Sequence, residues 1–168
     1  MGPGHLALGF AAKPATPKAP LWVLLIATEV LDLITFPLQA LGIESFAISQ
    51  VDLTNGLQLI KPAQMPWSHG LFMSILWSLI AAGIAFLVYR DRKTSGIIGM
   101  LVFSHWILDF IVHPPHLPLL FDGSPTVGLA LWTSGPGFIF SIFLEIALLA
   151  VGISFYIASR KRKKVLQK

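Results

Sequence analysis

Apolar side chains dominate four long stretches of the chain, at residues 21–43, 69–89, 95–113 and 136–158. A membrane-spanning helix needs about 20 mainly apolar residues, and each stretch is close to that length or exceeds it. The intervening segments are rich in proline, glycine and polar residues, which end helices. The pattern therefore predicts an all-α polytopic membrane protein with four transmembrane helices in a bundle, forming one membrane domain over residues 21–158.

The two ends of the chain differ from this domain. Residues 1–20 combine glycine, proline and alanine with two lysines, a composition that predicts a flexible cytoplasmic tail. Residues 159–168 form a basic cytoplasmic tail, for which we expect contact with anionic lipid. The stretch that starts at residue 21 is too long for the apolar core of a secretory signal peptide.

The composition agrees with a membrane protein. Hydrophobic residues make up 55% of the chain and charged residues 12%, whereas soluble domains average roughly 25% charged residues. The chain has no cysteine, which excludes disulfides, thiolate zinc sites and cysteine nucleophiles. Its net charge of +4 is concentrated in short segments beside the apolar stretches, so it bears on membrane topology and predicts no nucleic-acid partner.

Basic residues alternate between the two sides of the predicted membrane. They precede the first span, fill the turn between the second and third spans, and follow the fourth. Loops 41–68 and 114–135 together contain one basic residue, Lys61. The positive-inside rule then puts both termini in the cytoplasm and these two loops outside. We expect a multi-pass protein of the bacterial or archaeal cytoplasmic (inner) membrane. The basic residues that set this orientation are Lys13, Lys18, Arg90, Arg92, Lys93 and the run Arg160–Lys164.

The segment SHWILDFIVHPPH, residues 104–116, carries the strongest functional signal. His105, Asp109 and His113 follow one another at intervals of four, which places them on one stripe of a helix, and His116 comes just after. Ionisable groups inside a bilayer are costly and indicate a functional site by default. Imidazole and carboxylate bind divalent transition metals, so we expect zinc, with iron or manganese as alternatives.

The other three predicted spans contribute ionisable groups at a similar depth. Glu29 and Asp32 share a face near the middle of the first span, Glu145 lies near the middle of the fourth, and His69 begins the second. No lysine or arginine lies within any predicted span. A carboxylate at a helix centre costs about 2.5–3.5 kcal/mol, so cations, protons or mutual hydrogen bonds must offset these groups. The pattern predicts one polar site between the midplane and the outer leaflet.

Each candidate receives a role in this predicted site. We expect His69, His105, Asp109 and His113 to bind the metal, with Asp32 as a fourth ligand or as the general base. Asp32 and Glu145 are the candidate catalytic carboxylates. Glu145 is expected to act by hydrogen bonding to one of the metal ligands and orienting it.

A plainer interpretation exists for each residue taken alone. His105 and Asp109 would join helices through a hydrogen bond, and Ser68 would cap the helix that His69 begins. Glu44 would be an ordinary loop charge. The remaining candidates would be interfacial histidines or protonated carboxyl groups, and these are His113, His116, Glu145 and one of the pair Glu29 and Asp32.

Two motifs resemble the bacterial inner-membrane family of LexA-regulated metal-dependent hydrolases. PWSHGL at 66–71 is similar to the THSL motif at which a span of that family begins, and SHWILDFIVH contains its HxxxD pattern at His105 and Asp109. A shorter, four-span branch resembles the chain more closely, and its HxPDLPL-like continuation corresponds to HPPHLPL at 113–119. The early acidic motif of the family has a further histidine nearby, whereas no histidine adjoins Asp32 here.

The resemblance implies metal-dependent hydrolysis, and the membrane setting implies a lipid or lipid-linked ester or phosphoester as substrate. Two other classes of function stay open at this point. One is a metal-ion or proton transporter or channel, and the other is a non-catalytic structural membrane protein. The substrate, the number of metal ions, homo-oligomer formation and the role of loop 114–135 are left open by the sequence.

Overall fold

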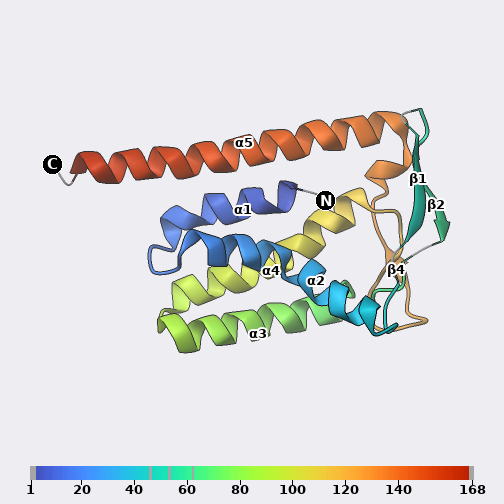
Figure 1. Cartoon of the computed structure of the whole chain (residues 1–168), viewed down its shortest axis with the longest axis horizontal. Coiled ribbons are helices and arrows are strands. Elements are labelled where there is room, and N and C mark those ends of the chain that lie inside the picture. The colour runs from blue at the N-terminus through green and yellow to red at the C-terminus, as the bar shows by residue number, and fades with distance from the viewer. Residues whose placement is uncertain (1–2, 46, 53, 62, 167–168) are drawn as a thin grey trace.

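The computed structural model describes residues 3–45, 47–52, 54–61 and 63–166. Within this part of the chain, four helices are long and apolar enough to cross a membrane, and they correspond to the four predicted spans. They run along the long axis of the molecule (Figure 1). These helices are α2 (Leu21–Ala40), α3 (Leu71–Tyr89), α4 (Arg92–Val112) and α5 (Gly135–Leu166).

Two helix ends differ from their predicted positions for local reasons. Helix α4 begins at Arg92, earlier than predicted, because the Asp91 carboxylate accepts a hydrogen bond of 2.8 Å from the backbone N–H of Thr94. Such an N-cap satisfies a donor that the first helical turn leaves unpaired. Helix α5 continues to Leu166, so the predicted basic tail at 159–168 starts as part of this helix. Lysine and arginine are good helix formers, and the run therefore continues the helix.

The prediction of a flexible tail at residues 1–20 is wrong. Residues Gly4–Ala12 form helix α1, and Lys13–Ala15 form the short helix η1. With nine residues, α1 is too short to span a membrane. It lies between α5 on one side and α2 and α4 on the other (Figure 1).

Small residues allow α1 to approach its neighbours closely. A Cβ atom on Gly152 of α5 would lie 2.4 Å from the carbonyl oxygen of Ala7, and one on Gly9 would lie 3.0 Å from that of Leu24. Helices in membranes associate through such close backbone contacts. The glycine and alanine content that suggested flexibility thus serves packing.

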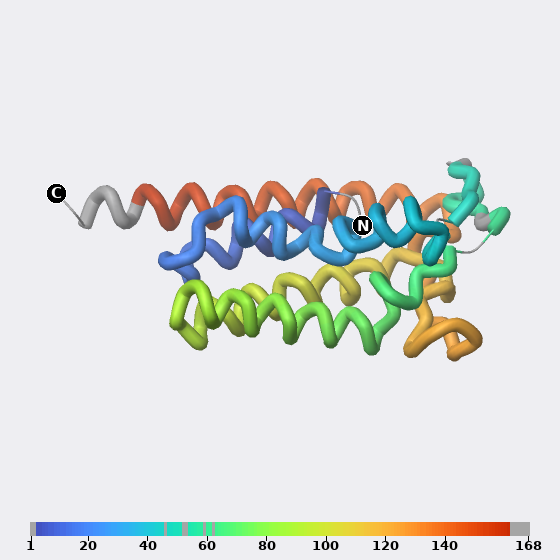
Figure 2. Tube along the Cα trace, turned by 60° about the horizontal axis from the view of Figure 1, so that its bottom comes forward, coloured from blue at the N-terminus to red at the C-terminus, as the bar shows by residue number. Residues whose placement is uncertain are grey.

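The four long helices do not form a simple four-helix bundle. Helix α4 packs against α2 and α3, whereas α5 reaches this group mainly through α1. Figure 2 shows α3 and α4 on the opposite side of α2 from α5. The core between the helices contains the fully buried side chains of Leu24 and Leu31 from α2 and of Val102 from α4. A fifth helix therefore completes the bundle that the sequence predicted with four.

The loops 41–68 and 114–135 contain small antiparallel sheets, so the protein is mainly helical and not all-α. In the first loop, β1 (Ile48–Asp52) pairs with β2 (Gly56–Lys61). In the second, β3 (Leu117–Pro118) pairs with β4 (Thr126–Val127), and helix η2 (Leu131–Thr133) follows. Both loops lie at one end of the bundle (Figure 1).

The opposite end of the bundle carries the basic residues. Lys18 Nζ lies 3.5 Å from Asp91 Oδ1, which links the turn before α2 to the turn between α3 and α4. Lys13 and Arg160 line one surface pocket at the same end. This arrangement agrees with the alternation seen in the sequence, and the side of the membrane on which this end lies stays a prediction.

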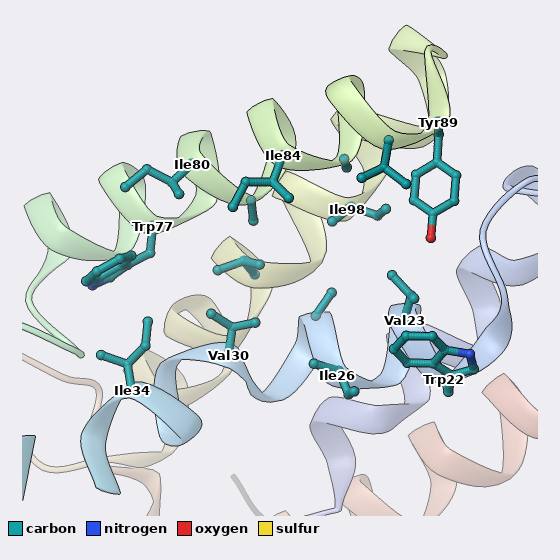
Figure 3. Close-up of a pocket in the computed structure, with 15 residues that line it drawn as sticks. Trp22, Val23, Ile26, Val30, Ile34, Trp77, Ile80, Ile84, Tyr89 and Ile98 are labelled. Atoms are coloured by element: carbon teal, nitrogen blue, oxygen red, sulfur yellow. The ribbon is translucent and has the colours of Figure 1, made fainter. Parts of the chain in front are cut away.

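An apolar groove of about 510 Å³ runs between α2 and α3 (Figure 3). Val30 of α2 and Ile84 of α3 face each other across it, and Ile98 of α4 lies beneath. Of the described residues that line it, only Tyr89 has an ionisable side chain. A second apolar pocket of about 580 Å³ continues the groove as far as Trp67 in the loop before α3.

Candidate metal centre

All five histidines of the chain gather in one region near the loop end of the bundle, together with two aspartates. We call this set the His/Asp cluster. Helix α1 contributes one histidine, α2 one aspartate, the turn before α3 one histidine, and α4 with the residues after it the rest. The cluster consists of His5, Asp32, His69, His105, Asp109, His113 and His116.

Ligand atoms of Asp32, His69 and His105 form a group that could hold one metal ion, and Asp109 Oδ2 lies beside both histidines. His69 Nε2 lies 3.3 Å from both His105 Nε2 and Asp32 Oδ1, and 3.5 Å from Asp109 Oδ2. His105 Nε2 lies 3.6 Å from Asp32 Oδ1 and 3.3 Å from Asp109 Oδ2. Ligand atoms about 2.0 to 2.1 Å from a tetrahedral zinc ion lie about 3.3 to 3.4 Å from one another. We call the point between these four atoms the inner position.

Hydrogen bonds on the far side of each ring determine which nitrogen faces the inner position with a lone pair. His105 Nδ1 lies 2.7 Å from the carbonyl oxygen of Thr28. A carbonyl oxygen only accepts hydrogen bonds, so Nδ1 carries a proton, and in the neutral imidazole the free lone pair is on Nε2. Metal-binding histidines are held in this way by an acceptor on their other nitrogen.

His69 is held in the same tautomer by a longer chain of hydrogen bonds. Ser68 Oγ lies 2.7 Å from Glu44 Oε2 and 2.9 Å from His69 Nδ1. Because a carboxylate only accepts, Ser68 donates to Glu44 and accepts the proton of His69 Nδ1. Thr35 Oγ1 donates to the carbonyl oxygen of Leu31 and lies 3.2 Å from His69 Nδ1, so it is a second acceptor for that proton.

When both imidazoles are neutral, the four groups that define the inner position are all acceptors. Two imidazole lone pairs and two carboxylate oxygens converge there, and the side chains of His105 and Asp109 are 1% and 5% exposed. A buried carboxylate is unfavourable without a compensating positive charge, so a cation bound between these groups would stabilise them. The buried His/Asp cluster could hold a metal ion.

Glu44 has a structural role that the interpretation as a loop charge missed. Its side chain is buried, and its Oε1 atom accepts hydrogen bonds of 2.9 Å from the backbone N–H groups of both Trp67 and Ser68. The predicted helix cap at Ser68 is wrong, because α3 follows an N-cap at Gly70 that makes no side-chain cap. The Ser68 hydroxyl instead connects Glu44 to His69.

Replacing Glu44 with alanine is expected to weaken zinc binding by about 10- to 100-fold, the usual effect of losing a group that orients a metal ligand. Without Glu44, the Ser68 hydroxyl is free to rotate and no longer fixes the tautomer of His69. Competition with a chelating dye measures the affinity. The neighbouring Ser45→Ala variant is the control, because its buried hydroxyl makes no hydrogen bond among the described residues. Equal zinc affinity in the Glu44 variant and wild type would contradict this role.

The backbone around His69 is also fixed from several sides. Trp106 Nε1 donates a hydrogen bond of 2.9 Å to the carbonyl oxygen of His69, and Trp77 Nε1 donates one of 2.8 Å to that of Trp67. A Cβ atom on Gly70 would lie 2.3 Å from the carbonyl oxygen of Pro66, so this tight turn requires glycine. These contacts explain how the PWSHG sequence delivers His69 to the cluster.

A cavity of about 280 Å³ opens onto the His/Asp cluster from the loop end. Asp32 is the most accessible carboxylate that lines it, with its side chain 47% exposed. The two loops between the helices complete its wall. Its other lining residues are Ala47, Ala63, Met65, His69, Asp109, His113, His116, Leu117 and Trp132.

His116 lies at this cavity, just beyond the end of α4. Its ring is 5.1 Å from that of His113, measured between centroids. Burial lowers the pKa of His116 to about 4, with a further contribution from His113, so the imidazole is neutral at pH 7. A neutral imidazole can bind a metal or hold a substrate by hydrogen bonding.

The structure brings together most of the residues singled out in the sequence. Asp32, His69 and His105 form one group of possible ligand atoms, Asp109 Oδ2 lies within 3.5 Å of both histidines, and His113 Nε2 lies 3.5 Å from Asp109 Oδ1. Their roles as ligands or as catalytic groups stay predictions.

Two of the carboxylates lie apart from the candidate metal groups. Glu145 is buried on α5 and belongs to neither group of ligand atoms. Glu29 accepts a hydrogen bond of 3.3 Å from Thr28 Oγ1 and also belongs to neither group.

His5 is the residue of the cluster that the sequence analysis missed. It stands in an apolar segment without charges, GHLALGFAA, that is too short for a span. A single histidine in such a segment is a weak signal, and only the packing of α1 shows its neighbours.

No family model, curated protein or solved structure matches this chain. The resemblance to the LexA-regulated hydrolases therefore stays a hypothesis based on two motifs.

Proposed function

We propose that the protein is a membrane-embedded, metal-dependent hydrolase of a lipid-linked ester or phosphoester. The observation that carries this proposal is the approach of Asp32 and Asp109 to the Nε2 atoms of His69 and His105, at distances of 3.3 to 3.6 Å, with Asp32 at the edge of a cavity. Zinc suits the nitrogen and oxygen ligands, and iron and manganese are alternatives. The two motifs that resemble metal-dependent hydrolases give independent support.

The chemistry requires a metal, a water molecule and a base. A divalent metal ion lowers the pKa of a bound water molecule to about 7, which supplies hydroxide at neutral pH. In the hydrolysis, the hydroxyl group of water bonds to the acyl or phosphoryl group, and its proton ends on the departing alcohol. Asp32 is accessible from the cavity and can carry that proton, whereas the enclosed Asp109 is better suited to hold the ion.

The lipid-linked substrate is inferred from the surroundings of the cluster. The cavity of about 280 Å³ suits one ester or phosphoester group, and the surrounding helices are long and apolar enough to span a membrane. The apolar groove between α2 and α3 extends to Trp67, two residues before His69. A lipid chain in that groove would bring its polar end to the end of the bundle at which the cavity opens. We place the protein in a bacterial or archaeal cytoplasmic membrane as part of this proposal.

Transport of metal ions or protons is supported less well. A pathway across the membrane needs polar groups along its length. In α4, no ionisable residue stands between Lys93 and His105, and in α2 none precedes Glu29. The ionisable groups of the spans are thus concentrated toward one end of the bundle.

The proposal predicts metal-dependent turnover by the full-length protein reconstituted in lipid. Hydrolysis of a panel of phospholipids and isoprenoid phosphoesters should stop with EDTA, return with zinc, iron or manganese, and fall at least about 100-fold in His69→Ala because an ion ligand is lost. Asp122→Asn, at an exposed loop position, is the matched control.

Two results would contradict this prediction. Turnover that EDTA does not affect would exclude the metal mechanism. Flux of metal ions or protons across proteoliposomes without turnover of any lipid would favour transport.

A further inference from the structure

The two oxygens of the Asp109 carboxylate face different pairs of histidines. Oδ2 lies 3.3 Å from His105 Nε2 and 3.5 Å from His69 Nε2, at the inner position. Oδ1 lies 3.4 Å from His5 Nε2 and 3.5 Å from His113 Nε2. A carboxylate with ligand atoms grouped around each oxygen has the geometry of a bridge between two metal ions.

The histidines on the Oδ1 side lack the hydrogen bonds that ordinarily fix a buried ring. His5 is 1% exposed, and among the described residues neither of its ring nitrogens has a hydrogen-bond partner. His113 Nδ1 is likewise buried without one. Buried polar atoms in folded proteins nearly always have partners, so an unpaired imidazole aimed at a carboxylate indicates a missing ligand. His5, His105 and Asp109 also form a second group of atoms that could hold a metal ion.

The stacking of two rings gives the expected distance between the ions. The rings of His5 and His105 are parallel to within 3°, with their centroids 3.8 Å apart. The Nε2 atoms of both rings point at the same carboxylate, one toward each oxygen. Two ions bound by parallel rings are separated by about the distance between the rings, and ions in two-metal hydrolytic sites are about 3.5 to 4 Å apart.

We infer that the His/Asp cluster binds two divalent metal ions bridged by Asp109. The inner ion is held by Asp32, His69, His105 and Asp109 Oδ2. The second ion, at what we call the outer position, is held by His5, His113 and Asp109 Oδ1. This inference rests on the proposed metal-dependent function and deepens it, because two bridged ions can hold the two ends of a phosphoester or ester bond during its hydrolysis. The side chain of His113 is 21% exposed at the cavity, so the outer ion faces the substrate.

Helix α1 is the element that makes the outer position, and its packing gives an independent way to perturb it. The close contact between Gly152 and Ala7 holds α1 on α5, because a Cβ atom at Gly152 would lie 2.4 Å from the Ala7 carbonyl oxygen. Alanine at position 152 therefore displaces α1, and His5 with it. Gly83 on α3 has open space around it and gives a matched glycine-to-alanine control in a helix of the same bundle.

The test is the zinc content of the full-length protein, purified in lipid nanodiscs, loaded with zinc and freed of excess metal. Wild type and Gly83→Ala are expected to hold two zinc ions per chain. His5→Ala and Gly152→Ala are expected to hold one, and so is His113→Ala, which perturbs the outer position without changing α1. Loading with Mn²⁺ gives a second measurement, because two ions bridged by a carboxylate show exchange coupling in electron paramagnetic resonance. That coupling is expected in wild type and should be absent in His5→Ala.

Each other outcome has a definite meaning. One zinc ion per wild-type chain, bound with or without His5, would overturn the outer position and leave the proposed hydrolase intact. One ion that is lost on His5→Ala would also overturn it, since His5 would then belong to a single site. No zinc in wild type would overturn both this inference and the proposed function. Circular dichroism of each variant establishes that the comparison is made between folded proteins.

Discussion

The Asp109→Asn variant is expected to lose all of its bound metal and to show turnover reduced by at least about 100-fold, because Asp109 supplies an oxygen to each proposed metal position. An amide is a much weaker metal ligand than a carboxylate, and its N–H₂ group brings a donor into a space built for a cation. Elemental analysis of the purified variant measures the first effect, and hydrolysis of the lipid panel measures the second.

The same substitution also separates a metal site from a purely structural hydrogen bond. A charged carboxylate is costlier to bury than a neutral amide, so replacing Asp109 with asparagine is expected to make the metal-free protein more stable than metal-free wild type. If Asp109 only joined helices, the variant would be less stable, and wild type would contain no metal. Asp122→Asn controls for the change from aspartate to asparagine at an exposed site.

Removal of metal from wild type is expected to lower its thermal stability substantially. A ligand present at about 1,000 times its Kd stabilises the folded state by about 4 kcal/mol, which for a chain of this size corresponds to a shift in Tm on the order of 10 °C. Once the cation is removed, repulsion among the acceptor atoms at the inner position also lowers the stability of the folded state. Thermal unfolding with zinc and with EDTA, followed by circular dichroism, measures the shift.

A variant that lacks one metal ligand tests whether the change in Tm comes from zinc bound at the His/Asp cluster. His105→Ala removes a ligand from the inner position, so zinc and EDTA are expected to give the same Tm in that variant. A zinc-dependent Tm in His105→Ala equal to that of wild type would show that zinc acts elsewhere on the protein. The basic end of the bundle, with Lys13 and Arg160, has no carboxylate cluster among the described residues and gives no reason to expect such binding.

Stretches of apolar residues were sufficient to predict the four long helices. Whether a segment can span a membrane depends on its own length of about 20 apolar residues. A membrane helix can therefore be predicted without knowing which helices pack against it. The intervals of four between His105, Asp109 and His113 likewise follow from one helix. Asp32 and His69 were found by their depth in neighbouring spans, and the structure brings them within 3.6 Å of His105.

Short segments were predicted less well, for a common physical reason. Helix α1 is nine residues long, and its position depends on glycine contacts with α5 and α2 that are distant in the sequence. Glu44 lies 24 positions from Ser68, and its role appeared only when the loop folded back against the start of α3. The short strands of the two loops depend in the same way on pairing between segments.

The sequence by itself determined the four long apolar helices, the stripe of candidate ligand residues on α4 and the absence of lysine and arginine from the predicted spans. These are local or compositional properties, set by the length of a segment, the periodicity of one helix and the residue types present. Only the tertiary structure decided that Glu145 stays outside both groups of possible ligand atoms and that α1 brings His5 beside His105. It also decided which nitrogen of each inner histidine has a free lone pair, because the hydrogen-bond partners that fix the tautomers come from other segments.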